Sequence, residues 1–185
     1  MSQSPWSGPA VFQQIQTKIM ASGVPRQGST LILDESADEK GGTHNAGAAR
    51  QYNGRMGKVD LCRVDTCLAY ANARVGRWTL VDGELSPPQE WFGEELAPIR
   101  QKLGIPEARQ YETKLQPVRV FGSGLKMVKR AKANGLPFEV LACDTLYGRD
   151  GQLRADLAAQ GVPYAAQVPG EPVKDGREEL DLGPA

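Results

Sequence analysis

Two short apolar segments, each ending in an aspartate, place the strongest constraint on how this chain folds. The segment 29–34 (STLILD) ends on Asp34, and the segment 138–143 (FEVLAC) is followed directly by Asp144. Short apolar runs bounded by glycine, proline and polar residues indicate buried β-strands. We therefore expect two buried strands, each with a carboxylate at its carboxyl end.

The other segments predict an α/β protein. We expect helices over 8–22, 124–134 and 150–160, and strands over 61–70, 77–85 and 164–168. A meander of strands followed by alternating helix and strand predicts a mixed sheet with helices on its faces. The connecting segments are expected as a hairpin or extended loop over 35–58, short helical turns over 89–114, and a loose polar tail over 170–185.

Composition narrows the chemistry that the chain can carry. Its 185 residues suffice for one domain with a sizeable core, and 22 basic residues balance 22 acidic ones. This balance gives no long-range attraction to nucleic acid, although it does not exclude a locally basic face. Three cysteines and one histidine, His44, argue against a disulfide scaffold, a zinc site or a histidine-based triad. Any chemistry is therefore expected from carboxylates.

The chain is expected to be soluble and cytoplasmic. No segment approaches the roughly 18 consecutive apolar residues of a membrane span. The first ten residues, MSQSPWSGPA, also lack the basic and then apolar stretch of a secretory signal.

Asp34 and Asp144 are the candidate catalytic residues. Ligand sites in open α/β sheets lie at the carboxyl ends of strands, so the two carboxylates converge if their strands are neighbours. A hard divalent cation would relieve their mutual repulsion, and a pair of such ions suits phosphodiester chemistry. The alternative is that each aspartate only begins a turn or caps a helix. Spacing alone leaves both interpretations open.

Six blocks of sequence resemble one family, the bacterial insertion-sequence DDE transposases, whose catalytic domain is ribonuclease-H-like. In chain order the blocks are LILDESADEKGG, GAARQYNGRMGKVDLCRVD, WTLVDGELSPPQEWF, RQKLGIPEARQYETK, GLKMVKRAKANGLPFEVLACDTLYGRD and GVPYAAQVP. The resemblance spans about Pro5 to Pro169, and it implies a partial ribonuclease-H-like catalytic domain over 29–169 after a helical lead-in over 1–28.

The resemblance implies specific roles for several residues. Asp34 and Asp144 match the family's first and second catalytic aspartates, which would hold Mg²⁺ or Mn²⁺, two ions in the complete site. Tyr147 and Gly148 match an aromatic-glycine pair that follows the second aspartate. Lys40 matches a basic position after the first aspartate, although Gly41 replaces a second lysine often found there. The implied activity is cleavage and transfer of DNA strands at transposon ends.

Basic residues outside the carboxylate pair have a weaker claim to function. Lys40, Arg50, Arg55 and Lys58 are candidates for contact with a DNA backbone, with solvated hairpin charges as the equal alternative. The tryptophans Trp78 and Trp91 are interpreted as core or covering residues rather than platforms for base stacking.

The third acid of the family, a glutamate on a later helix, has no matching block here. Glu171, Glu178 and Glu179 are weak candidates on a single helical turn. The chain is therefore expected to be a fragment, apparently truncated at both ends and of doubtful activity, which could self-associate. Two alternatives stay open: a non-catalytic module that binds DNA ends or interferes with intact transposase, and an unrelated carboxylate-metal phosphoesterase.

Overall fold

The structure is a computed structural model that describes residues 7–41, 45, 47–103, 117–168 and 179–182. The chain divides into two compact units, each built from separate stretches of sequence. The first unit comprises Met1–Asp34, Cys67–Gly83 and Gly124–Ala185, and the second comprises Glu35–Thr66 and Glu84–Ser123. Both candidate catalytic aspartates belong to the first unit.

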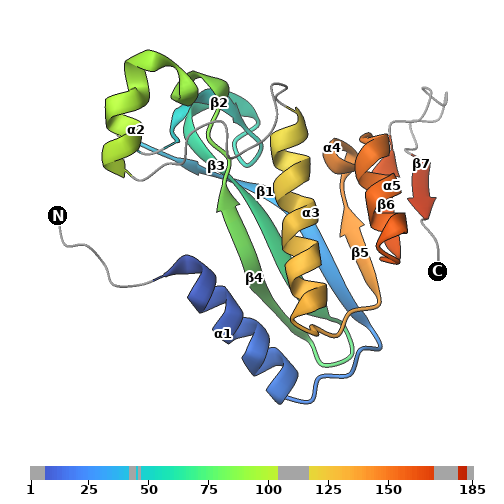
Figure 1. Ribbon diagram of the computed structural model, residues 1–185. Coiled ribbons are helices and arrows are strands. Elements are labelled where there is room, and N and C mark those ends of the chain that lie inside the picture. Colours follow the sequence, from blue (N-terminus) through green and yellow to red (C-terminus); the bar gives the residue numbers. More distant parts are fainter. Residues whose placement is uncertain (1–6, 42–44, 46, 104–116, 169–178, 183–185) are drawn as a thin grey trace. The chain divides into compact units, whose positions relative to one another are not determined.

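Seven strands form one mixed sheet among the described residues (Figure 1). Their order is β2-β3-β1-β5-β6-β7, and β4 pairs with β3. The strands are β1 (Ser29–Glu39), β2 (Ala49–Asn53), β3 (Lys58–Asn72), β4 (Arg77–Leu85), β5 (Val140–Cys143), β6 (Tyr164–Val168) and β7 (Glu179–Leu182). Parallel pairing of β1, β5 and β6 combined with antiparallel hairpins confirms the predicted ribonuclease-H-like mixed sheet.

The helices match the periodic segments of the sequence. They are α1 (Gly8–Ala21), α2 (Ala97–Leu103), α3 (Pro117–Ala133), α4 (Thr145–Gly148) and α5 (Gly151–Ala159), with 3₁₀ turns η1 (Gln89–Phe92) and η2 (Glu94–Leu96). The short helical turns predicted after residue 88 are confirmed as far as residue 103, and residues 104–114 lie outside the described residues. None of the helices within the described residues is long and apolar enough to cross a membrane.

The largest differences between predicted and observed boundaries occur at three elements. Strand β1 continues past Asp34 to Glu39, because backbone pairing persists where hydrophobicity stops; the amide of Lys40 still donates to the carbonyl of Leu61 at 3.0 Å. Helix α3 begins at Pro117 rather than residue 124, since proline suits a first helical turn even though glycines follow it.

The tail is the third difference. It was expected to be loose, yet Glu179–Leu182 form β7 and pair antiparallel with β6, Val168 opposite Glu179. This strand also replaces the helical turn that was considered for Glu179. Residues 169–178, which include Glu171 and Glu178, lie outside the described residues.

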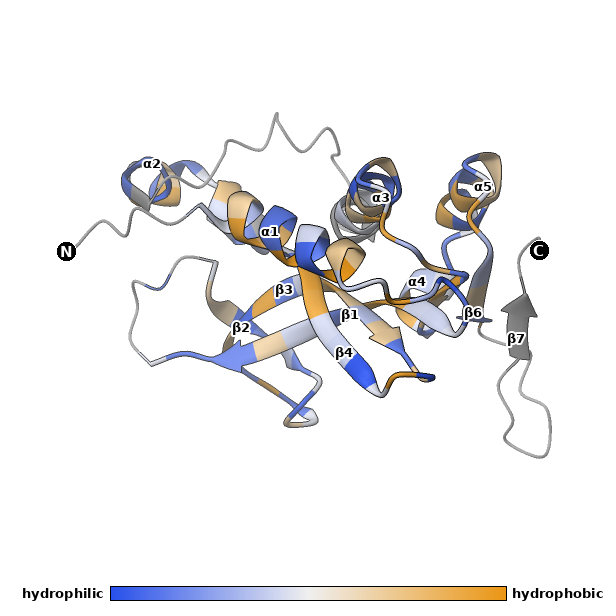
Figure 2. Ribbon diagram, turned by 90° about the horizontal axis from the view of Figure 1, so that it is seen from below, coloured by the Kyte–Doolittle hydropathy of each residue, from blue (hydrophilic) through white to orange (hydrophobic). Residues whose placement is uncertain are grey.

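The core of the first unit lies on one face of its strands. Leu31, Leu33 and Leu141 are fully buried, and α3 packs so closely that a Cβ added at Gly124 would lie 2.7 Å from Leu33 Cδ2. In Figure 2, helices α1, α3 and α5 all lie on this side of β1 and β4. The opposite face of these strands therefore keeps more exposed side chains, such as Ile32.

A buried glutamine ties α1 into this unit. Gln16 is 2% exposed, and its amide nitrogen donates to the carbonyl of Val81 at 2.9 Å while its oxygen accepts from Asn134 at 2.9 Å. These bonds satisfy a polar group that would otherwise be costly to bury. Gln16 therefore links the first helix, strand β4 and the end of α3.

In the second unit, the β2–β3 hairpin sets the position of the surrounding turns. Arg50 pairs with Leu61 in this hairpin, which confirms the expected hairpin over part of 35–58. Buried Trp91 donates from its indole nitrogen to the carbonyl of Ala48 at 2.8 Å, and Arg100 donates to the carbonyl of Trp91 at 2.6 Å. Trp91 is thus a core residue, as predicted.

Helix α4 packs closely against strand β6. A Cβ at Gly148 would lie 1.8 Å from the carbonyl oxygen of Gln167, which no side chain could tolerate without movement of the backbone. The glycine matched by the family's aromatic-glycine pair is therefore required by close approach. Its neighbour Tyr147 is fully buried.

We expect Gly148→Ala to destabilise the protein by about 1–3 kcal/mol, the usual range for overpacking. The matched control is Gly151→Ala at the start of α5, where an added Cβ meets nothing within 4 Å. Urea unfolding of both variants measures the difference. Equal stability of the two variants would contradict the close α4–β6 contact.

Candidate functional site

The register of β1 and β5 brings the two predicted aspartates together. These strands pair in parallel, with Ile32 opposite Ala142 and Leu33 opposite Cys143. The next residues on the two strands are Asp34 and Asp144. Because neighbouring strands lie about 4.8 Å apart, the two backbones hold these residues side by side.

Strand alternation sets the side of the sheet on which Asp34 lies. Leu31 and Leu33 are fully buried on the face that packs against α3, so Ile32 and Asp34 face the other way. Both Asp34 and Asp144 are exposed. The carboxylates are therefore accessible to solvent and to a substrate.

Asp144 also caps helix α4. Its backbone is extended, and its Oδ1 atom accepts hydrogen bonds from the amides of Leu146 at 3.0 Å and Tyr147 at 3.4 Å. Both bonds use the same oxygen, so the cap orients the carboxylate and does not engage Oδ2. The structure thus realises both sequence interpretations of this aspartate, as a cap and as a carboxylate at a paired site.

The donor set of this pair suits a hard divalent cation. Two carboxylates placed side by side repel each other, and a cation between them removes that cost. Magnesium is commonly bound through one or two carboxylates, with water completing its coordination shell. The residues present therefore fit the ions expected from sequence. Within the described residues, no group of three or more His, Cys, Asp and Glu side chains is arranged to hold a metal ion.

Cys143 does not contribute to this donor set. Burial, together with the negative charge of Asp144, raises the pKa of its thiol to about 11. Cys143 is also paired with fully buried Leu33 in the parallel register, so its side chain lies on the buried face, opposite to that of Asp34. Its nature as a small, partly buried apolar residue agrees with the sequence interpretation.

One residue near the site was missed by sequence analysis. Arg154 on α5 donates to the carbonyl of Gly148, and its charge acts to lower the pKa of Cys143 against the effect of burial. Nothing in its spacing singled it out, because the contact depends on how α5 folds back on α4.

The four candidate DNA-backbone residues lie in the second unit, and two of them are neutralised locally. Lys40 is paired with Asp38, and Lys58 with Asp60 at 2.8 Å. The hydrogen bond from Lys40 lowers the pKa of the Asp38 carboxyl, and the bond from Lys58 lowers that of Asp60. Arg50 and Arg55 are exposed on the β2–β3 hairpin.

The interpretation of Trp78 as a core or covering residue is wrong. Its side chain is 81% exposed, the largest exposure among the large apolar residues of the described chain. It lies on β4 next to Arg77. The first four residues of β4 are exposed or half-buried, and burial along the strand begins only at Val81 and Asp82.

Comparison with known protein families shows which family this chain belongs to. The model of the DDE superfamily endonucleases matches residues 1–173 of the chain. The chain belongs to the DDE superfamily endonuclease family. No match was found among the curated proteins. As a DDE endonuclease domain, the chain has a nuclease- or transposase-type function with DNA as its substrate, and such endonucleases generally use divalent metal ions.

The double role of Asp144 gives a stability prediction. We expect Asp144→Ala to lower the free energy of unfolding by about 0.5–2 kcal/mol, because the amides at the start of α4 lose their acceptor. Asp144→Asn should stay within about 0.5 kcal/mol of wild type, since asparagine caps helices as well as aspartate does. Chemical denaturation of both variants measures this, and equal losses would contradict the observed cap.

Proposed function

We propose that this chain is the catalytic part of a DDE transposase, in which Asp34 and Asp144 together bind the divalent ions needed to cleave and transfer DNA strands. The observation that carries the proposal is the β1–β5 register, which sets the two aspartates next to each other although they are far apart in sequence. We assign the catalytic domain to residues 29–169, with the helix of 8–21 preceding it.

The residues of the site have distinct tasks in this proposal. Bound Mg²⁺ or Mn²⁺ would activate a water or 3′-hydroxyl and stabilise the leaving oxygen. Asp34 offers its carboxylate from the middle of β1, and Asp144 offers Oδ2 while the α4 amides hold Oδ1. Since both groups are exposed, a phosphodiester can reach them without rearrangement of the core.

Rigidity of the second aspartate supports this role. The cap to α4 fixes its side chain, and the contact between Gly148 and Gln167 fixes α4 on β6. Positioning of this kind matters because small misplacements of reacting groups cost large factors in rate. The aromatic-glycine pair therefore contributes by holding the carboxylate rather than by touching the substrate.

The test of this proposal is nicking of plasmid DNA that carries the element's ends, in Mg²⁺ or Mn²⁺. We expect Asp34→Asn and Asp144→Asn each to lower the nicking rate by about 100-fold or more, because each removes a metal-binding charge. The asparagine at 144 keeps the cap, so the loss is not one of folding. Asp156→Asn on α5 is the matched control and should stay within about twofold.

Metal binding is measured separately, by the loss of the free Mn²⁺ electron paramagnetic resonance signal on titration with protein. Wild type and Asp156→Asn should take up Mn²⁺, and the double variant Asp34→Asn/Asp144→Asn should not. Nicking that survives both single substitutions, or Mn²⁺ uptake that survives the double one, would refute the proposed site.

A further inference from the structure

The closed end of the β3–β4 hairpin is unusually exposed for a segment of its composition. This hairpin tip, Ala73–Trp78 (ARVGRW), has every residue exposed, with Val75 at 42% and Trp78 at 81%. Figure 1 shows it at the lower end of β3 and β4. A large aromatic side chain left open to water, beside a second exposed apolar residue, is typical of a contact surface.

Trp78 borders a groove between the hairpin tip and helix α1. Gly76, Arg77 and Trp78 line it from the hairpin, and Ile15, Lys18 and Ile19 line it from α1. Leu80, further along β4, is 39% exposed.

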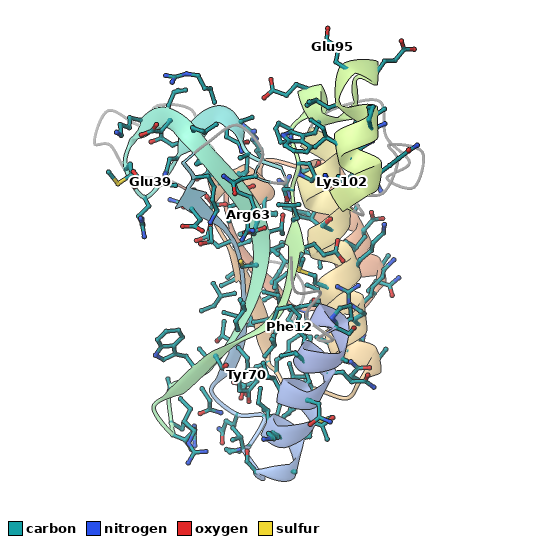
Figure 3. The ribbon with its side chains drawn as sticks, turned by 90° about the vertical axis from the view of Figure 1, so that its left-hand side faces the viewer. Phe12, Glu39, Arg63, Tyr70, Glu95 and Lys102 are labelled. Atoms are coloured by element: carbon teal, nitrogen blue, oxygen red, sulfur yellow. The ribbon has the colours of Figure 1, made fainter. Side chains whose placement is uncertain are left out.

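The surroundings of the tip are basic. Lys18 of α1 and Arg77 of β4 line one groove of about 480 Å³, whose floor includes Ile15, Ile19 and Tyr70. Figure 3 shows Tyr70 on the side of β3 that faces α1. No acidic residue lines this groove among the described residues. Positive charge at the rim of an apolar groove favours an anionic partner.

Lys18 and Arg77 form no ion pair with another described residue. Neither Lys18 nor Arg77 takes part in the ion pairs Lys40–Asp38, Lys58–Asp60, Arg63–Asp65 and Arg130–Asp82. By contrast, two of the four cations first suggested for DNA contact are locally neutralised. Lys18 and Arg77 therefore keep their positive charge at the groove that Trp78 borders.

Arg74 contributes less to this charge. Its aliphatic stem packs over Gly28, where an added Cβ would lie 2.9 Å from Arg74 Cγ. Glu139 accepts a hydrogen bond from the amide of Gly28 at 2.7 Å, so a carboxylate lies nearby and offsets part of the arginine charge. Lys18 and Arg77 therefore carry the positive end of the surface.

We infer that the hairpin tip binds an unpaired stretch of the DNA substrate, with a base stacked on Trp78 and backbone phosphates on Arg77 and Lys18. The inference rests on the proposed function, which brings DNA to this chain. An exposed aromatic ring beside free cations is how proteins bind single strands, since every base offers a face for stacking. A paired duplex hides those faces, so the surface favours unpaired nucleotides over duplex.

The test is binding of a fluorescein-labelled twelve-nucleotide oligothymidylate to the full chain, followed by anisotropy in EDTA so that no cleavage occurs. We expect Trp78→Ala to weaken binding by about tenfold, equivalent to about 1.4 kcal/mol, and Trp78→Phe to stay within about threefold of wild type. Arg77→Ala and Lys18→Ala should each lower the slope of log affinity against log salt by about 1. The matched control Lys129→Ala, an exposed lysine on helix α3, should change affinity by less than about twofold.

Tryptophan fluorescence supplies a readout that a merely structural role would not move. The oligonucleotide should quench the emission of wild type, and this quenching should be lost in Trp78→Phe although binding persists. Trp78→Ala with wild-type affinity, or quenching that persists in Trp78→Phe, would overturn the inference. So would equal weakening in the Lys129→Ala control, or sedimentation showing that Trp78→Ala only disrupts self-association.

The outcomes separate this inference from the proposed function. Binding that depends on Trp78 while Asp34→Asn and Asp144→Asn still nick DNA would refute the catalytic site and leave the tip as a binding surface. Nicking that requires both aspartates without any dependence of binding on Trp78 would refute the tip alone.

Discussion

The parallel pairing of β1 with β5 is the constraint on which the site depends. Leu33 lies opposite Cys143, and everything about the carboxylate pair follows from the residue after each. A slip of one residue in this register would turn one aspartate toward the buried face, because strand side chains alternate. The leucines of β1 prevent that slip, since Leu31 and Leu33 fill the core under α3. Packing of these leucines on one face of the sheet therefore fixes the position of the carboxylates on the other face.

Much of this could be predicted from the sequence because the signals were local. The apolar runs before Asp34 and Asp144, the glycine that ends the helix before β5, and the capping aspartate at 150 each report on their own neighbourhood. The adjacency of the two aspartates could be stated only as a condition, because parallel register is a long-range property. The family resemblance implied that Asp34 and Asp144 share one site, and the structure shows their strands paired.

Failures of prediction came where long-range pairing overrides local composition. Strand β1 continues through ESADE although those residues are polar, because β3 supplies the hydrogen bonds. The segment 179–182 forms β7 because β6 offers an open edge. The exposure of Trp78 was missed for another reason: composition favours burial of tryptophan, but Trp78 lies at the start of β4, where the strand is not yet buried. The free or paired state of the basic residues also depends on neighbours that spacing alone does not identify.

The Asp144 carboxylate caps helix α4 and also forms part of the proposed cation site. The order of α4 is therefore coupled to binding of a cation at that site. One oxygen holds the first turn of a four-residue helix and the other is left for a cation. By thermodynamic linkage, a cation that binds only the capped arrangement must make fraying of that helix less frequent, and fraying must weaken cation affinity by the same factor. Fraying of helix α4, which is too short to be stable alone, would therefore release a cation from the carboxylate pair.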